Sequence, residues 1–309
     1  MGKIRQAENG AAKTKKSLFD NVGTFMKKDF PVWILIIPSI ILFIFVIWRP
    51  IFIGFIYSFF KLRGFTPVEF VGLKNYVDVM SDTNFLNVLT NSVQYVLWAI
   101  IIGFPLPFIV AIMLNEMVHL KGFFKISVYL PVVVPAIATY MIWYYLYLPG
   151  DAGVLNLILG KLGLEPLEWL QNKRMVIPLL LITSTWHGFG SQTLVYLAGL
   201  QGINTELYEA CKIDGGGFFT RIRVVVFPFM KGTLLLLLIR LMINIFQILE
   251  MPLTMTGGGP NGASLSMGLQ TYKYAFEYAQ MDKSMAMGVI TFLILICLTF
   301  IYARAEKNK

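Results

Sequence analysis

Thiol and imidazole side chains are scarce in this sequence, which has two cysteines and two histidines in 309 residues. Cys211 and Cys297 are far apart, one in a loop and one in an apolar segment, so a structural disulfide is not expected. Because zinc sites are built mainly from Cys and His side chains, His119 and His187 leave almost no ligands for one. We therefore expect no metal and no cofactor in this chain.

Charged residues are also few. They make up 14% of the sequence, whereas hydrophobic residues make up 57% and the mean hydropathy is +0.68. This composition excludes an ordinary soluble domain and predicts an integral membrane protein. The net charge of +9 comes mainly from tails and loops beside apolar segments, where Lys and Arg meet anionic lipid. Since no basic stripe with interleaved aromatic residues occurs outside those segments, no nucleic-acid partner is expected.

Three further absences narrow the class of protein. A nucleotide-binding P-loop needs G-x-x-x-x-G-K followed by Ser or Thr, and the sequence GKLG at 160–163 does not supply it. The chain therefore carries no recognisable ATPase. It also shows no internal repeat of the kind that many secondary transporters carry. No Asp/His cluster or nucleophile–base pair occurs in the apolar segments, so we do not expect an enzyme.

Long apolar runs dominate what is present. Six of them reach the length of about 20 residues that a transmembrane helix needs. They cover residues 32–60, 85–115, 126–148, 175–200, 232–256 and 284–303. The sequence thus predicts an all-α, polytopic membrane protein with six transmembrane helices. The first run is longer than the h-region of about 7–15 residues in a cleavable signal peptide, so we expect it to remain in the protein.

The distribution of basic residues predicts the orientation of these helices. With residues 1–30 placed inside as a cytoplasmic basic tail, the inner segments carry 16 of the 26 Lys and Arg residues and the outer segments carry 8. The positive-inside rule then places both termini in the cytoplasm. It also places there the polar interruption at 201–231, between the fourth and fifth apolar runs.

This interruption has the pattern of a compact elbow. A short helical run at 207–214 is followed by three glycines and by a basic segment that ends at Pro228. Glycine accepts a positive φ at a helix end without a Cβ penalty, so the chain can turn sharply there and enter the membrane again. An exposed elbow between two spans is suited to attaching a soluble partner.

The residues of the elbow also carry a family resemblance. The positions that follow the spacing of the EAA motif are Glu209, Ala210, Cys211, Gly215, Val225, Phe227 and Pro228. In this the chain resembles the membrane subunits of bacterial ABC importers. The sequences LAGLQGINTELYEACKIDG at 197–215, MTGGGP at 255–260 and FVGLKNYVDVM at 70–80 are similar to the sugar-permease branch, and more to the larger permease of the maltose transporter.

The resemblance implies a fold, a mechanism and partners. It implies the type I ABC importer permease fold for residues 31–309, with a coupling loop at about 201–231 that inserts into a nucleotide-binding subunit. Glu209 would make the charged contact, Leu207, Tyr208 and Ala210 would pack, and Gly215 would turn the chain after Asp214. The implied partners are a second permease subunit, an ATPase dimer that binds ATP and Mg, an extracellular solute-binding protein and membrane lipid.

Three positions depart from the family pattern. Asn204 stands where Pro is usual, Cys211 replaces a second Ala, and Gly216 replaces Ala. All three replacements are small or compatible with a turn. Asn204 or Thr205 can cap the short helix, with Glu206 favourable in its first turn. The departures concern the details of docking and leave the elbow intact.

The fifth apolar run contains a polar stripe. Its members Arg240, Asn244, Gln247 and Glu250 recur at spacings of four, three and three. On a continuous helix this spacing confines them to one side. Because an ionisable side chain near the centre of a span costs about 2.5–3.5 kcal/mol, such residues generally face a bundle interior or a wet cavity. We interpret the stripe as a substrate path, with pairing of Arg240 inside the helix bundle as the alternative.

Aromatic residues supply further candidates for the substrate path. Trp186 lies in TSTWHGFGSQT at 183–193, where His187 is more typical of an interhelical hydrogen-bonder than of a ligand. Tyr272 and Phe276 follow the sharp GGGP turn at 257–260. They can stack on a sugar or contact the binding protein, and the alternative is an interfacial aromatic belt.

The leading hypothesis is therefore a permease subunit of an ATP-driven importer that works by alternating access. Its expected substrate is a carbohydrate, with an oligosaccharide favoured. A self-sufficient secondary sugar transporter is the alternative from another class, although Glu250 is the only obvious carboxylate well inside a span for ion coupling. An ABC permease for glycerol phosphate or another polyol is a further alternative. Because the Arg240 guanidinium can bind an anion, an acidic sugar is a candidate substrate as well.

Overall fold

The computed structural model describes residues 34–307, and the chain divides into two units, Met1–Ile56 and Tyr57–Lys309. The basic tail at 1–30 lies outside the described residues. The helix Ile34–Tyr57 contains a π-helical turn, η1 (Ile44–Trp48), followed by α2 (Arg49–Tyr57). In η1 the amide of Arg49 bonds to the carbonyl of Ile44. The turn thus lets Pro50, which has no N–H, follow without breaking the helix.

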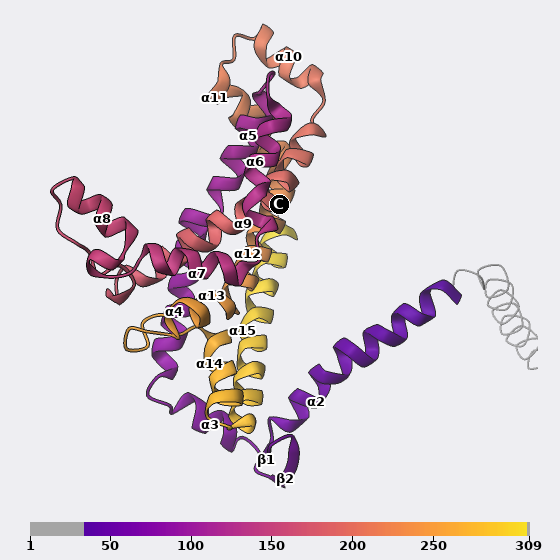
Figure 1. Ribbon diagram of the computed structural model, residues 1–309. Helices are drawn as coiled ribbons and strands as arrows, with labels where there is room; N and C mark the ends of the chain where they lie inside the picture. Colours follow the sequence, from indigo (N-terminus) through magenta and orange to yellow (C-terminus); the bar gives the residue numbers. More distant parts are fainter. Residues whose placement is uncertain (1–33, 308–309) are drawn as a thin grey trace, which may run out of the picture. The chain divides into compact units, whose positions relative to one another are not determined.

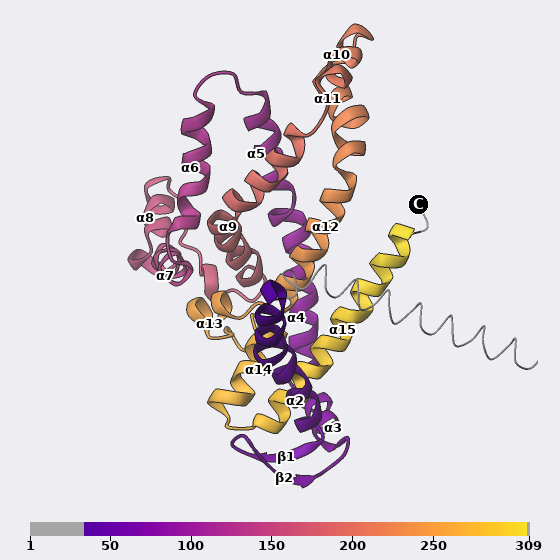
Figure 2. The ribbon, with the colours of Figure 1, turned by 90° about the vertical axis from the view of Figure 1, so that its right-hand side faces the viewer.

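The second unit is mainly helical and is shown in Figures 1 and 2. Its first half contains α3 (Lys74–Met80), α4 (Phe85–Trp98), η2 (Ala99–Gly103), α5 (Pro105–Glu116), α6 (Lys121–Val133), α7 (Ala136–Leu146), α8 (Val154–Lys161) and α9 (Val176–Gln201). Its second half contains α10 (Thr205–Ile213), α11 (Phe218–Arg221), η5 (Ile222–Val226), α12 (Phe227–Phe246), α13 (Glu250–Thr256), α14 (Met267–Tyr272), η6 (Lys273–Glu277) and α15 (Met281–Lys307).

The sequence predicts six spans, and fewer helices among the described residues have the length and composition of a span. Among the described residues, four helices are long and apolar enough to cross a membrane: Ile34–Tyr57, Phe85–Glu116, Phe218–Phe246 and Met281–Phe300. The pair Lys121–Val133 and Ala136–Leu146 would make a fifth, but it is bent by 90°. The predicted count of six is therefore not confirmed. Helix α9 has 26 residues, and the polar sequence TSTWHGFGSQT in its middle lowers its hydropathy.

The bend between α6 and α7 contradicts the single predicted helix at 126–148. Val134 is extended, with ψ 134°, and Pro135 follows it. The residue before a proline is pushed out of the helical region by the proline ring, so α6 ends there. The apolar run at 126–148 predicts one helix, but Pro135 within it ends the first half.

A β-hairpin corrects the all-α prediction. Strands β1 (Phe60–Arg63) and β2 (Thr66–Phe70) pair antiparallel, with Phe60 opposite Phe70. Their rings lie 5.3 Å apart, and Gly64 has φ 62° in the turn. Aromatic cross-strand pairs stabilise such a ribbon, and a glycine at positive φ closes it without strain. The aromatic pair and the glycine turn thus favour a hairpin over a helix where the first apolar run ends.

The predicted fifth span is interrupted. Helix α12 ends at Phe246 and α13 begins at Glu250, so Gln247–Leu249 forms a break. Pro252 explains it, because its ring would clash with the carbonyl of Ile248 in a continuous helix. The hydroxyl of Ser266 donates to that carbonyl instead. Gly268 lets α14 approach the break, since a Cβ there would lie 2.3 Å from the carbonyl oxygen of Gln247.

Two buried clusters form the core of this unit. The larger joins α4, α9 and α12–α15 through side chains such as Tyr95, Leu180 and Met287. The smaller lies toward α10, where Tyr196 and Met230 pack among α5, α9 and α12. Gly190 lets α6 approach α9 closely, because a Cβ there would meet the backbone oxygen of Val128 at 2.2 Å. The two clusters hold the elements that carry the candidate sites.

Candidate functional site

The predicted elbow is present and lies at one end of the second unit. Figures 1 and 2 show α10 and α11 there, with β1, β2 and α3 at the opposite end. The amide of Glu206 donates to Oδ1 of Asn204 over 3.0 Å, so Asn204 is the cap in place of the usual proline. After α10, Gly215 has φ 78° and its amide bonds to the carbonyl of Lys212. The predicted short helix and glycine turn are thus confirmed.

Two of the departures from the family pattern meet in space. A Cβ on Gly216 would lie 2.5 Å from Sγ of Cys211 and 2.7 Å from its carbonyl oxygen. The amide of Gly216 also donates to that carbonyl over 2.8 Å. Gly216 therefore accommodates the larger Cys211 side chain and closes the turn around it.

Most of the predicted coupling residues are exposed. The exposed members are Leu207, Glu209, Ala210, Asp214 and Gly215. Ile213 and Phe219, on either side of the three glycines, are also highly exposed, at 86% and 83%. Sequence reasoning did not single out these two, although large apolar residues in an exposed loop between apolar segments are a signal of a contact surface. The elbow therefore presents a carboxylate beside apolar side chains.

Tyr208 differs from its neighbours because it points back toward the protein. It is half-buried against the smaller core cluster, and within the described structure its hydroxyl has no hydrogen-bond partner. Burial raises the pKa of the Tyr208 phenol, the Glu116 carboxylate raises it further, and Arg221 opposes them. Tyr208 thus attaches α10 to the membrane helices.

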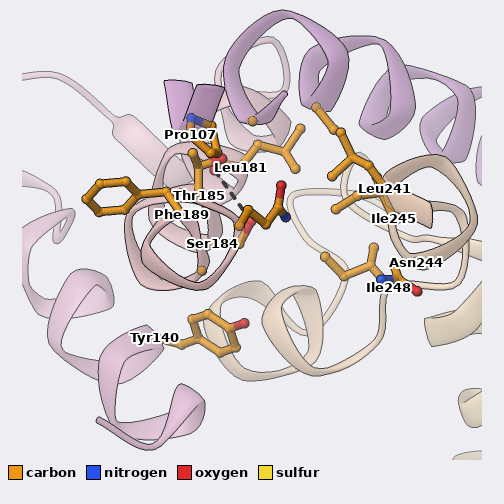
Figure 3. A pocket seen from close by; sticks show the side chains of 14 residues that line it. Pro107, Tyr140, Leu181, Ser184, Thr185, Phe189, Leu241, Asn244, Ile245 and Ile248 are labelled. Carbon is orange, nitrogen blue, oxygen red and sulfur yellow. Dashed lines mark hydrogen bonds between the residues drawn. The ribbon is translucent and has the colours of Figure 1, made fainter. Parts of the chain in front are cut away.

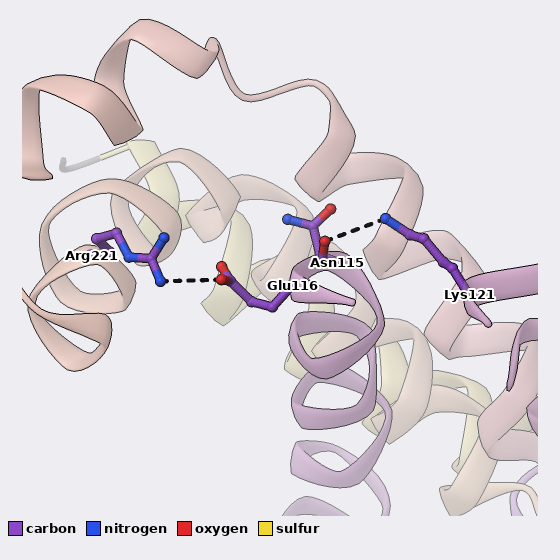
Figure 4. Close-up of polar contacts among 4 residues, drawn as sticks. All are labelled: Asn115, Glu116, Lys121 and Arg221. Carbon is purple, nitrogen blue, oxygen red and sulfur yellow. Dashed lines mark hydrogen bonds and ion pairs between the residues drawn. The ribbon is translucent and has the colours of Figure 1, made fainter. Parts of the chain in front are cut away.

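An ion pair lies beside Tyr208 and was not predicted from the sequence. A guanidinium N–H of Arg221 donates to Oε2 of Glu116 over 3.1 Å, which joins α11 to the end of α5 (Figure 4). Nearby, Nζ of Lys121 donates to the carbonyl of Asn115 over 3.3 Å. The two partners of the ion pair are 105 residues apart in sequence. No local pattern could have paired them.

The polar stripe does not lie on one continuous helix. Arg240 and Asn244 are on α12, Gln247 is in the break, and Glu250 begins α13. The helical geometry used to place them on one side is therefore wrong beyond Phe246, because Pro252 interrupts the helix. All four residues are exposed in this chain. They remain available to a neighbouring subunit or to a solute.

A cavity of about 270 Å³ lies next to Asn244, among η2, α5, α7, α9 and α12 (Figure 3). Its polar lining includes Tyr140, Ser184, Thr185, Gln192 and Asn244. Of the predicted path residues, Asn244 is the one that lines it. Ser184, Thr185 and Gln192 belong to the polar sequence already noticed on α9, but reasoning from the sequence chose the aromatic Trp186 instead.

The remaining candidates occupy separate places. Trp186 is 42% exposed and meets Trp143 edge-on at 5.8 Å. Nε2 of His187 lies 3.0 Å from the carbonyl of Val134, which the α6–α7 bend leaves outside a helix. This confirms the expected interhelical hydrogen bond of His187. Tyr272 and Phe276 pack together at 5.0 Å, and Phe276 is largely exposed.

A second cavity of about 270 Å³ adjoins the GGGP turn. It is lined by Tyr144, Leu170, Gln171 and residues of the 254–260 segment. Within residues 34–307, no group of three or more His, Cys, Asp or Glu side chains gathers in a way that could hold a metal ion. The polar groups around the cavities are amides, hydroxyls and backbone groups, which suit a neutral polyhydroxyl solute.

The chain is similar to transport proteins over nearly its whole length. It is 29% identical over 278 residues to the trehalose/maltose transport system permease protein MalF of Thermococcus litoralis, covering 90% of this chain and 94% of that one. It is 27% identical to the arabinooligosaccharides transport system permease protein AraP of Bacillus subtilis, covering 90% and 88%. A sulfoquinovosyl glycerol permease protein of Agrobacterium fabrum is 28% identical, covering 89% and 90%.

A solved structure supports the fold. A chain of a bacterial ABC transporter involved in the import of the acidic polysaccharide alginate superposes with a TM-score of 0.80 at 20% identity, covering 93% of this chain and 99% of that one. The sequence also matches the family described as binding-protein-dependent transport system inner membrane component, over residues 103–308. That match includes the elbow, the break and every cavity-lining residue except Ala99. The chain therefore belongs to the family of inner membrane components of binding-protein-dependent transport systems.

Proposed function

We propose that this chain is a permease subunit of an ATP-driven importer that takes up an oligosaccharide delivered by an extracellular solute-binding protein. The observation that carries the proposal is the exposed, capped elbow in a chain whose relatives are permeases for sugars and oligosaccharides. The hydroxyl and amide groups in the lining of the cavity beside Asn244 agree with a neutral sugar.

The elbow is the proposed docking site for an ATPase dimer. Glu209 supplies the charged contact, Leu207 and Ala210 pack against the partner, and Gly215 shapes the turn after Asp214. Tyr208 supports this surface from the inside. ATP and Mg²⁺ are bound by that partner, since the sequence has no P-loop. Both termini and the tail at 1–30 lie in the cytoplasm in this proposal.

A second permease subunit completes the substrate path. Arg240, Asn244, Gln247 and Glu250 are exposed in the isolated chain, and polar residues at this depth face a partner or a wet cavity. We place the sugar between the two subunits beside the α12–α13 break, where amides and carboxylates can bind hydroxyls. Trp186, Tyr272 and Phe276 supply aromatic surface along the path or at its outer opening.

Purified complexes test the proposal. The chain is co-expressed with its cognate permease, ATPase and binding protein, and a panel of neutral and acidic glycans, glycerol phosphate and polyols is titrated into the binding protein by calorimetry. We expect an oligosaccharide to bind, and uptake of that sugar into proteoliposomes to require ATP. Binding of glycerol phosphate or a polyol alone would favour that branch of the family. Ion-driven uptake by this chain without the ATPase would favour a secondary transporter.

A further inference from the structure

The elbow is tied to one long helix of the second unit. α4, η2 and α5 run without interruption as Phe85–Glu116, a helix of 32 residues. At a rise of about 1.5 Å per residue it extends about 48 Å, enough to cross a bilayer with turns to spare. Glu116 is its last residue, and the ion pair with Arg221 connects it to α11 beside the elbow.

The ion pair is partly protected from water. The Arg221 side chain is 16% exposed and that of Glu116 is 40% exposed. Tyr208 of α10 is half-buried, and the charges of both residues act on its phenol. An ion pair with one partner mostly shielded from water is screened less than a fully exposed pair. A movement of α10 and α11 is therefore resisted at the end of α5.

The other half of the same helix holds the loop between α13 and α14. Nδ2 of Asn91 donates to the carbonyls of Gly262 and Leu265, over 2.8 and 3.1 Å. The Tyr95 hydroxyl donates to the carbonyl of Ser264 over 3.0 Å. The hydroxyl oxygen of Ser92 accepts from the amide of Met267 over 2.9 Å. These three α4 side chains are buried, so the loop is fixed to the helix through its own backbone.

We infer that the Glu116–Arg221 ion pair is a positioning contact that links movement of the elbow, through helix Phe85–Glu116, to the loop at 257–266. The pair fixes α11 to one end of the helix, and Asn91, Ser92 and Tyr95 fix the loop near the other. This inference rests on the proposed function, because it assumes that an ATPase moves the elbow. It assigns to the pair a role in coupling that docking alone does not require.

A thiol placed in the loop reports on its movement. Ala263→Cys, a half-buried position, is introduced into the full complex together with Cys211→Ala and Cys297→Ser, and a water-soluble maleimide is applied with and without ATP and vanadate. We expect ATP to change the labelling rate when Glu116 and Arg221 are both present. Glu116→Arg and Arg221→Glu should each bring the ratio of the two rates close to one, and the double exchange should restore it.

Controls separate the pair from its surroundings. Arg223→Glu makes the same charge change on an exposed residue two positions away and should leave the ratio unchanged. Arg221→Lys, which keeps the charge but loses the fork geometry, should give an intermediate ratio and serves if the reversals fail to assemble. Single reversals with the wild-type ratio, or a double exchange that restores nothing, would overturn the inference. A wild-type complex that does not hydrolyse ATP would overturn the proposed function instead.

Discussion

The elbow and the α12–α13 break are both interruptions in apolar sequence, but they are built in opposite ways. The elbow is exposed, and its shape comes from bonds within a few residues: the Asn204 cap, the Gly215 turn and the Gly216 amide. The break is closed by residues from elsewhere in the chain, including Ser266 and Gly268. The elbow can therefore meet a partner while keeping its shape, whereas the break depends on the packing of α14.

The largest expected effect concerns the elbow. Glu209→Lys should abolish uptake, because it reverses the charge proposed to contact the ATPase, while leaving the exposed helix α10 folded. Uptake in cells and the amount of chain in the membrane are measured together. Glu206→Lys, which changes an exposed carboxylate of the same helix, is the matched control and should retain more uptake. Normal uptake by the Glu209 variant would remove the basis for the docking site.

A substitution at the α12–α13 break should change the stability of the complex rather than the docking of the ATPase. Gly268→Ala places a Cβ within about 2.3 Å of the Gln247 carbonyl, so α14 must shift. Overpacking of this kind costs about 1–3 kcal/mol, which should appear as a lower Tm of the detergent-solubilised complex. Gly288→Ala on α15, where no atom lies within 4 Å, is the control and should leave Tm unchanged or raised. Equal Tm values for the two variants would show that the break tolerates movement of α14.

Polar residues beside the break should affect transport without affecting assembly. Gln247→Ala and Glu250→Ala remove exposed groups that are proposed to contact the sugar, so the KM for uptake should rise while the purified complex keeps its subunits. Loss of one good hydrogen bond to the sugar corresponds to a rise in KM of about tenfold. Loss of assembled complex would instead assign these residues to packing between helices or subunits.

The smallest expected effect concerns the inner side of the elbow. Tyr208→Phe removes a buried hydroxyl that has no hydrogen-bond partner in the described structure. Removing an unsatisfied buried polar group is neutral or stabilising by about 1 kcal/mol. Thermal unfolding of the complex checks this, and Tyr208→Ala, which also removes packing, should destabilise it. A clear loss of stability in the Phe variant would mean that the hydroxyl binds a group contributed by a partner.

The sequence predicted those features that depend on neighbouring residues. The cap at Asn204 and the glycine turn follow from local chemistry, and the family pattern located the elbow. The hairpin and the α6–α7 bend also have local causes in Gly64 and Pro135, which were outweighed by the apolar composition around them.

Other features depend on contacts between residues that are distant in the sequence, so the sequence alone does not predict them. The Glu116–Arg221 pair joins residues 105 positions apart, and no periodicity relates them. The interaction of Ser266 with Ile248, and the contacts of Asn91 with the 257–266 loop, require knowledge of which helices pack together. The cavity beside Asn244 likewise combines residues of five elements. Each depends on tertiary packing, which local pattern does not determine.

The central claim is that this chain transports only when a separate ATPase acts on its elbow. The most direct measurement is uptake, into proteoliposomes, of the oligosaccharide that the cognate binding protein holds, by the complete complex and by this chain alone. We expect ATP-dependent uptake by the complex, loss of that uptake with Glu209→Lys, and none by the single chain. Uptake by the single chain, driven by an ion gradient and unaffected by Glu209→Lys, would contradict it.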